Sequence, residues 1–292
     1  MDRKTARTVS PGQVRTRFAP SPTGALHLGH AWSAILSHDF AVTHGGTFLL
    51  RIEDIDGTRS RPDHVAGILD DLAWLGLRFE GPVFQSERLA SYAAALDRLR
   101  AMGLVYPCFC TRAEIAASLS APHGAAVAYP GTCRRLTPAE VQARMGEPHC
   151  WRLDMARALA LAGPLAWFDH GRRVEADPAP QGDVVLARKD APASYHLAVT
   201  LDDAAQGVTD IVRGVDLFDA THVHRLLQAL LGLPTPRYHH HPLLTGPGGR
   251  RLAKRDGAPS LAAQRVAGQD GRALADALRR GELPAGLSLA KP

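Results

Sequence analysis

The sequence predicts an α/β protein whose Rossmann-type, doubly wound parallel sheet is split by an insertion. In residues 1–105, segments typical of strands alternate with segments typical of helices. The alternation stops between residues 106 and 182, where cysteines, prolines, glycines and short alternating stretches dominate, and it resumes from residue 183. Alternating strands and helices are typical of a parallel sheet that carries helices on its faces.

Each element of the first half follows from local sequence signals. A strand over residues 14–20 ends at Pro20, and a helix begins at Gly29 or His30 and continues to residue 45. Residues 46–56 predict a second strand with a charged exit, and residues 86–103 predict a further helix. Between them, residues 61–77 predict a helix from apolar positions at three-to-four spacing: Val65, Ile68, Leu69, Leu72 and Leu75.

We expect four parts along the chain. Residues 1–105 form the first half of a catalytic domain, and residues 106–182 form an insertion with its own small core. Residues 183–257 form the second half, where regular alternation of elements resumes over 182–190 and 195–214, followed by a helix over 220–232 and a basic glycine-rich loop. Residues 258–292 form a short segment of one or two polar-faced helices.

Composition limits the class of protein. Of the 292 residues 45% are hydrophobic, and no run of about 18 apolar residues or N-terminal apolar segment is present. We therefore expect a cytoplasmic protein with no membrane association, and we expect a monomer. The formal net charge of +5 favours a polyanionic partner such as nucleic acid or nucleotide, although it equally suits a role in solubility.

The stretch "APSPTGALHLGH" over residues 19–30 suits neither a helix nor a strand. A helix that opens directly after a strand presents unpaired backbone N–H groups and a positive dipole end, which together bind phosphate. Gly24 and Gly29 allow close approach of a ligand to the backbone, and His27 and His30 can donate hydrogen bonds to it. The alternative interpretation is two surface histidines in a turn.

A second phosphate-binding signal comes late in the chain, in "LLTGPGGRRLAKRDG". Arg250, Arg251, Lys254 and Arg255 share a loop with several glycines. A flexible cationic loop suits phosphoryl or nucleotidyl transfer, because it can close over the charge that develops as pyrophosphate leaves. By itself such a loop is a solvated basic turn, but its combination with the early histidine motif in a split α/β domain predicts a nucleotide site.

Three of the four cysteines, Cys108, Cys110 and Cys133, lie near one another in the predicted insertion. In a reducing compartment such a cluster indicates a structural zinc site, and zinc prefers four ligands in a tetrahedron. Chemistry alone nominates His123 or Cys150 as the fourth ligand, although Cys150 also suits a buried structural thiol. The alternative is three reduced cysteines around a small core.

The histidine run over residues 239–241 does not predict a metal site, because successive side chains of a strand alternate between its faces. We expect only His241 to lie near the nucleotide.

Several strings together resemble a known family. "RFAPSPTGALHLGH", "FLLRIEDIDGTRS", "LAWLGL", "QSERLASY", "IVRGVDL" and "RRLAK" occur in the order typical of class I aminoacyl-tRNA synthetases of the glutamyl type. The resemblance covers nearly all of the chain up to Arg255. It implies a Rossmann-type catalytic domain, L-glutamate and ATP as substrates, and Mg²⁺ bound with ATP.

The resemblance also implies residue roles. We expect His27, His30 and Lys254 to be catalytic and Tyr129 to be the fourth zinc ligand. The residues expected to bind ATP are His27, Gly29, His30, Arg251 and Lys254. The residues expected to bind glutamate are Arg17, Phe18, Ala19, Pro20, Ser21, Glu53, Tyr195 and Arg213.

The residue types agree with these roles, because two carboxylates need cations and an ammonium needs an anion. Arg17 and Glu53 stand at the carboxyl ends of predicted strands, where ligands of open α/β sheets bind. Taken singly, Arg17, Glu53 and Arg213 equally suit surface ion pairs, and Tyr195 suits a core tyrosine.

The chain departs from full-length glutamyl-tRNA synthetases in two ways. The 37 residues after Arg255 are too few for the expected anticodon-binding domain, which needs about 100 residues. In the late motif Arg251 replaces the usual first lysine and Ala253 replaces the serine, whereas Lys254, the position that contacts ATP in the family, is retained.

The closer resemblance is therefore to the shortened glutamyl-Q tRNA(Asp) synthetases. This resemblance implies transfer of glutamate to queuosine in the anticodon of tRNA(Asp). The alternatives are a glutamyl-tRNA synthetase with a separate anticodon-binding partner, a non-catalytic tRNA-binding paralogue, or another nucleotidyltransferase with an HxGH motif that activates a small carboxylic acid.

Overall fold

The computed structural model describes residues 13–111, 114–115, 129–189, 191–246 and 259–290. Three parallel strands in the order β1-β2-β3 form the sheet of the first half: β1 (Arg15–Phe18), β2 (Thr47–Ile52) and β3 (Glu80–Phe84). The helices α1 (Leu28–Thr43) and α2 (Pro62–Trp74) provide the crossover connections. The apolar side chains of these two helices and of the sheet form one buried core.

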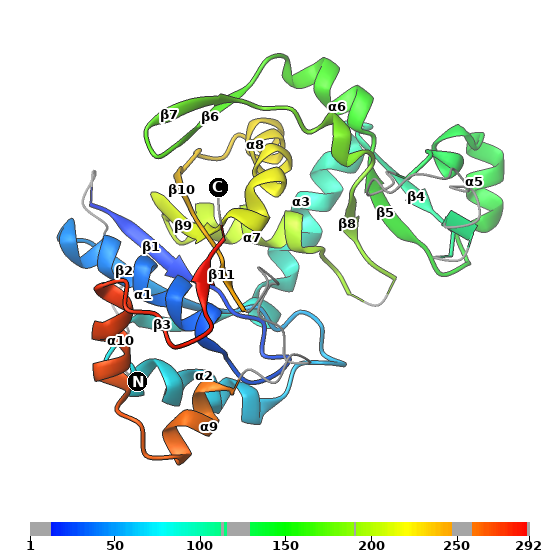
Figure 1. Ribbon diagram of the computed structural model, residues 1–292. Helices are drawn as coiled ribbons and strands as arrows, with labels where there is room; N and C mark the ends of the chain where they lie inside the picture. The colour runs from blue at the N-terminus through cyan, green and yellow to red at the C-terminus, as the bar shows by residue number, and fades with distance from the viewer. Residues whose placement is uncertain (1–12, 112–113, 116–128, 190, 247–258, 291–292) are drawn as a thin grey trace, which may run out of the picture.

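Another sheet lies beside the first (Figure 1), and it combines two strands of the second half with two strands from residues 166–175, which we expected in the insertion. Its order is β7-β6-β10-β9, from β6 (Ala166–Asp169), β7 (Arg172–Glu175), β9 (Asp210–Gly214) and β10 (Arg237–His241). The strands β6, β9 and β10 run parallel, and β7 is antiparallel to β6. The backbone N–H of Thr209 donates to the carbonyl of Arg15 at 3.0 Å, so β9 begins beside β1. The carboxyl ends of β1, β2 and β9 therefore face one region.

The helices α7 (Tyr195–Ala205) and α8 (Phe218–Leu231) pack with α3 (Leu89–Ala101) in a second apolar core. The predicted helix over 86–103 begins with a short 3₁₀ turn, η1 (Gln85–Arg88), before α3 starts. Another 3₁₀ turn, η4 (Val215–Leu217), joins β9 to α8.

A small antiparallel sheet forms a separate layer at the right of Figure 1. Its order is β4-β5-β8, from β4 (Val105–Cys108), β5 (Cys150–Leu153) and β8 (Val185–Ala187). The helices α5 (Pro138–Arg144) and α6 (Met155–Ala162) and the turns η2 (Thr132–Arg135) and η3 (Ala179–Gln181) accompany it. We expected the strand near 182–190 in the parallel sheet. It pairs with β5 instead. The prediction was wrong because a short apolar run indicates a strand but does not indicate which strand it pairs with.

The last segment folds back onto the first half of the chain. α9 (Leu261–Val266) packs against α2, and α10 (Gly271–Arg279) packs against α1, where Arg279 forms an ion pair with Asp39 at 2.7 Å. The short strands β11 (Leu244–Thr245) and β12 (Ser288–Leu289) pair antiparallel. Within the described ranges, no helix is long and apolar enough to cross a membrane.

Buried Asp202 on α7 connects three segments. Its carboxylate accepts hydrogen bonds from Gln85 and Tyr92, each at 2.8 Å, and from Arg88 at 2.5 Å. Its side chain has no exposed surface. Removal of this anion leaves a cation and two polar groups without their acceptor, which destabilises a buried site strongly.

We therefore expect Asp202→Ala to lower the free energy of unfolding by about 3–5 kcal/mol, measured by urea denaturation at pH 7. Asp97→Ala serves as the control, because Asp97 is exposed on α3 and only pairs with Arg100 one turn away, so its change should stay within about 0.5 kcal/mol. Equal stability of the two variants would contradict this role.

Candidate active site

A cavity of about 510 Å³ lies where the carboxyl ends of β1, β2 and β9 meet the start of α1. The structure brings all of the described residues predicted for glutamate and ATP to this cavity: Arg17, Phe18, Ala19, Pro20, Ser21, His27, Gly29, His30, Glu53, Tyr195 and Arg213. His241 also lines it, as does Trp32. Arg251 and Lys254 lie outside the described residues, as do His123 and the other basic residues of the late loop.

One end of the cavity is the N-terminus of α1, which two histidines cap reciprocally. The Nδ1 atom of His27 accepts from the backbone N–H of Gly29 at 3.1 Å, and Nδ1 of His30 accepts from the N–H of His27 at 3.1 Å. The ring centroids are 3.9 Å apart. A Cβ atom at position 29 would lie 3.0 Å from His27 Cε1, so a glycine allows this ring to lie across the helix end.

These hydrogen bonds fix the protons of both rings. Because each Nδ1 accepts from a backbone N–H, a neutral His27 or His30 must carry its proton on Nε2. Each ring is therefore an Nε2–H donor beside the positive end of α1. This arrangement suits an anion such as a phosphate group.

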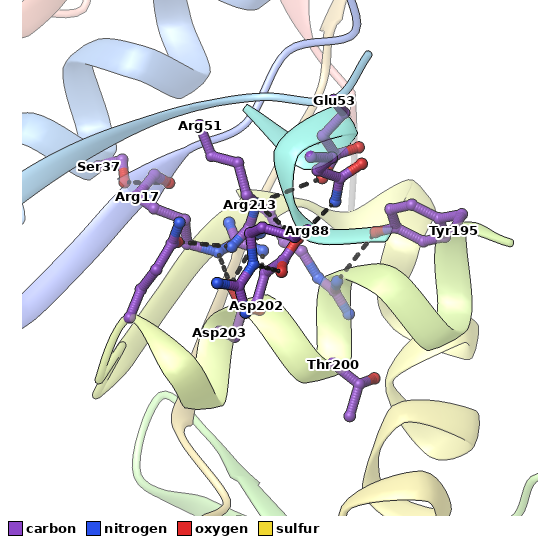
Figure 2. A network of polar contacts seen from close by, with 12 residues as sticks. Arg17, Ser37, Arg51, Glu53, Arg88, Tyr195, Thr200, Asp202, Asp203 and Arg213 are labelled. Atoms are coloured by element: carbon purple, nitrogen blue, oxygen red, sulfur yellow. Dashed lines mark hydrogen bonds and ion pairs between the residues drawn. The ribbon is translucent and has the colours of Figure 1, made fainter. Parts of the chain in front are cut away.

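The other end of the cavity holds two buried arginines whose positions are fixed from behind (Figure 2). Arg17 is 5% exposed, and its Nε and Nη2 atoms donate to the two oxygens of Asp203 at 3.0 and 3.4 Å. The same carboxylate accepts from Arg51 Nη2 at 2.9 Å. Arg213 is 3% exposed and donates through Nη1 to the hydroxyl of Tyr195 at 3.3 Å.

Glu53 also lines the cavity, directly after β2. Burial raises the pKa of Glu53 to about 7, although Arg51 and Arg17 lower it and Asp203 and Asp202 raise it further. The Arg51 Nε atom is 3.8 Å from its carboxylate. Asp203 differs: burial raises its pKa, but Arg17 and Arg51 lower it more, so the net shift is downward. Glu53 is therefore a carboxyl group that can exchange a proton near neutral pH.

Asp203, Arg51 and Asp202 were not among the residues predicted for the site. A sequence signal for two of them exists in "LAVTLDDAAQG", where two adjacent aspartates interrupt the apolar face of a helix. Both are buried, and such charges in a core need partners.

A larger cavity of about 820 Å³ adjoins the first and shares Ser21, Glu53 and Tyr195 with it. It extends to the small antiparallel sheet, where Arg152, Arg188 and Lys189 line it, together with Cys110 and Cys150. Arg188 forms an ion pair with Asp56 at 3.7 Å, which connects the loop after β8 to the loop after β2.

The structure also brings the three predicted cysteine ligands together. The Sγ atoms of Cys108, Cys110 and Cys133 lie within 4.8 Å of one another, and Cys110 and Cys133 are 3.4 Å apart. The thiolates around one tetrahedral zinc ion are about 3.8 Å apart, so this group fits such an ion. These three side chains are placed to bind a metal.

The fourth predicted ligand, Tyr129, places its hydroxyl 3.5 Å from Cys110 Sγ. The same hydroxyl accepts from the backbone N–H of Cys133 at 2.8 Å, and Arg152 stacks on the ring at 4.0 Å. Cys150, the alternative that chemistry alone nominated, is buried and faces Cys108 across the β4–β5 pair.

With this geometry established, the comparison with known proteins identifies the class. The family model "tRNA synthetases class I (E and Q), catalytic domain" matches residues 13–286. Fold and site therefore define a class I aminoacyl-tRNA synthetase catalytic domain, and such enzymes are ligases.

Comparison with individual proteins shows which group of class I synthetases the chain belongs to. The glutamyl-Q tRNA(Asp) synthetase of Rhodobacter capsulatus is 51% identical over 264 residues, which cover 87% of this chain and 95% of that protein. The enzyme of the same name from Symbiobacterium thermophilum is 46% identical, with 86% and 81% coverage. The chain belongs to the family of the glutamyl-Q tRNA(Asp) synthetases.

A solved structure agrees with the fold. Glutamate-tRNA synthetase from Elizabethkingia anophelis matches with a TM-score of 0.69 and 31% identity over 84% of this chain. The match covers 53% of that synthetase, so the present chain spans about half of its length.

The raised pKa of Glu53 predicts a stability effect. Its pKa is about 7 in the folded protein against 4.5 ordinarily, so its contribution to stability is full below pH 4.5 and is lost as the pH rises to 7. Glu53→Gln does not titrate. We expect it to be more stable than the wild type by up to about 3 kcal/mol at pH 8, with little difference at pH 4.5.

Urea denaturation at the two pH values measures this effect. Glu87→Gln is the matched control, because Glu87 is exposed on η1 and should give no gain at either pH. A Glu53→Gln protein that is less stable than the wild type at pH 8 would contradict the assignment of a strained, buried carboxylate.

The cysteine cluster predicts a metal-dependent fold in the small sheet. We expect Cys110→Ser to lose most of its bound zinc, measured by elemental analysis of purified protein, and to unfold at a lower temperature. Cys150→Ser tests the alternative ligand, and it should keep the zinc. Full zinc content in Cys110→Ser would remove the site.

Proposed function

We propose that the protein activates L-glutamate with ATP and transfers it to queuosine in the anticodon of tRNA(Asp). The supporting observation is a cavity that has Arg17, Arg213 and the Glu53 carboxyl group at one end and two Nε2–H imidazoles at a helix N-terminus at the other. The first end has the charges that an amino acid with two carboxylates requires, and the second suits phosphate.

In the first step, an α-carboxylate oxygen of glutamate attacks the α-phosphorus of ATP. The bond from that phosphorus to the bridging oxygen breaks, and pyrophosphate leaves with the electron pair. Little covalent chemistry falls to the protein, so positioning and stabilisation of charge supply the acceleration. Arg17 and Arg213 would bind the carboxylates, while ionised Glu53 would bind the ammonium group.

At the phosphate end, His27 and His30 would donate from Nε2 to phosphate oxygens, and the backbone at Gly29 would allow close approach. Arg251 and Lys254, which lie outside the described residues, would stabilise the leaving pyrophosphate. Magnesium bound with ATP would supply further neutralisation of the phosphate charge.

In the second step, a hydroxyl of the queuosine cyclopentene ring attacks the carbonyl carbon of the glutamyl-adenylate. An ester bond forms, the bond to phosphate breaks, and AMP leaves; its phosphate can take the hydroxyl proton. The 820 Å³ cavity supports this step, because it adjoins the glutamate end and is lined by the cations Arg152, Arg188 and Lys189. RNA phosphates require such cations.

Zinc would have a structural role, with Cys108, Cys110, Cys133 and Tyr129 as ligands. Burial raises the pKa of the Tyr129 hydroxyl, so a phenolate requires the charge of the bound ion. By fixing the turns around β4, the ion would fix one wall of the larger cavity. A cytoplasmic, monomeric enzyme remains our prediction.

The activation step predicts ATP–pyrophosphate exchange that requires L-glutamate and no RNA. We expect His30→Ala to lower the exchange rate by about 100-fold, because one preorganised donor to the phosphates is lost. His44→Ala is the control, because His44 is exposed after the end of α1. Absence of exchange in the wild type would contradict the catalytic proposal.

The transfer step predicts a specific acceptor. With labelled glutamate, we expect charging of tRNA(Asp) that contains queuosine and none of the same tRNA without it. Charging of tRNA(Glu) instead would favour a glutamyl-tRNA synthetase that acts with a separate anticodon-binding partner.

A further inference from the structure

One residue of the histidine run on β10, His240, contacts Arg213 without lining the cavity. His240 is buried, and its Nε2 atom lies 3.2 Å from Nε of Arg213. On the other side of the ring, Nδ1 lies 3.0 Å from Oδ1 of Asp169 on β6. The neighbouring His239 contacts Asp210 at 3.0 Å and takes no part in this chain of contacts.

Arg213 and Asp169 require the same tautomer of His240, whereas the Thr221 hydroxyl, whose Oγ1 lies 3.2 Å from Nε2, can donate or accept and so fits either tautomer. An arginine Nε–H can only donate, so Nε2 of His240 must accept and the ring proton must be on Nδ1. The Asp169 carboxylate accepts that proton, and the same oxygen accepts the backbone N–H of His240 at 3.1 Å. Burial lowers the pKa of His240 to about 4 and Arg213 lowers it further, which keeps the ring neutral at pH 7.

The remaining contacts of Arg213 orient its Nη1 atom toward the cavity. Nη2 donates to Thr221 Oγ1 at 2.6 Å and to the carbonyl of Leu217 at 3.1 Å. Nη1 is the atom that reaches Tyr195 in the cavity lining. Because His240 also holds Nε, the guanidinium has one orientation. The side-chain entropy of Arg213 is therefore already lost on folding, so ligand binding does not have to reduce it further.

We propose that Asp169 and His240 are positioning residues that fix the tautomer of one ring so that Arg213 presents Nη1 to the substrate carboxylate. The proposal rests on the proposed function for the identity of the ligand, L-glutamate. Asp169 is outside the set of residues that line the cavity, so its effect must pass through His240.

The near-isosteric variant Asp169→Leu tests this relay. It removes the oxygen that accepts from both the ring Nδ1–H and the backbone N–H of His240, so the ring is no longer held with Nε2 as an acceptor for Arg213. We expect the dissociation constant for L-glutamate, measured by titration calorimetry, to rise about 10-fold or more, with the KM for ATP in pyrophosphate exchange unchanged. His239→Gln on the same strand is the control and should bind L-glutamate as the wild type does.

A second pair of variants covers the case in which Asp169→Leu does not fold. His240→Gln keeps an acceptor oxygen for Arg213 and should bind L-glutamate within a few-fold of the wild type. His240→Leu removes the acceptor and should lose affinity about 10-fold or more. Equal affinity of the Gln and Leu variants would overturn the positioning role.

Nitrogen NMR of the His240 ring tests the tautomer without any ligand. We expect the proton on Nδ1 in the wild type; a wild-type proton on Nε2 overturns the proposal. Wild-type protein that does not bind L-glutamate contradicts the proposed function. Wild-type binding that Asp169→Leu leaves unchanged overturns only the positioning role.

Discussion

Arg51 places a permanent positive charge at the centre of the molecule, where its side chain has no exposed surface. A buried guanidinium destabilises a fold strongly unless anions surround it. Asp203 lies 2.9 Å away and Asp202 4.0 Å. Because both aspartates belong to α7 and Arg51 belongs to β2, the second half of the chain must dock against the first in one position. The charge cluster therefore sets the relation between the two parallel sheets.

The same cluster determines the chemistry of the cavity. Both oxygens of Asp203 accept from Arg17, and one of them also accepts from Arg51, so the arginine that faces the ligand is fixed by the residue that stabilises the core. Burial next to two aspartates raises the pKa of Glu53 to about 7. At the start of α1, a hydrogen bond on the far side of the ring likewise orients His30. Its Nδ1 accepts from the backbone, so Nε2 carries the proton that can be donated to a ligand. The site is thus preorganised by contacts outside its ligand surface.

The sequence predicted the parallel α/β fold and the surface of the site, but not the contacts behind it. Arg17 and Glu53 were predicted because they follow strands and match family motifs, and both line the cavity. Asp169 carries no local signal, because its meeting with His240 depends on the pairing of β6 with β10, 71 residues apart. The pairing of β8 with β5 was missed for the same reason. Periodicity predicts an element but not its neighbour.

The most direct test is a crystal structure with a non-hydrolysable analogue of glutamyl-adenylate. The account predicts that the glutamyl carboxylate and the carbonyl end lie against Arg213 and Arg17, with the ammonium group on Glu53. It also predicts the phosphate within hydrogen-bond distance of Nε2 of His27 or His30. An analogue bound with its phosphate at the arginines, or outside the 510 Å³ cavity, would contradict it.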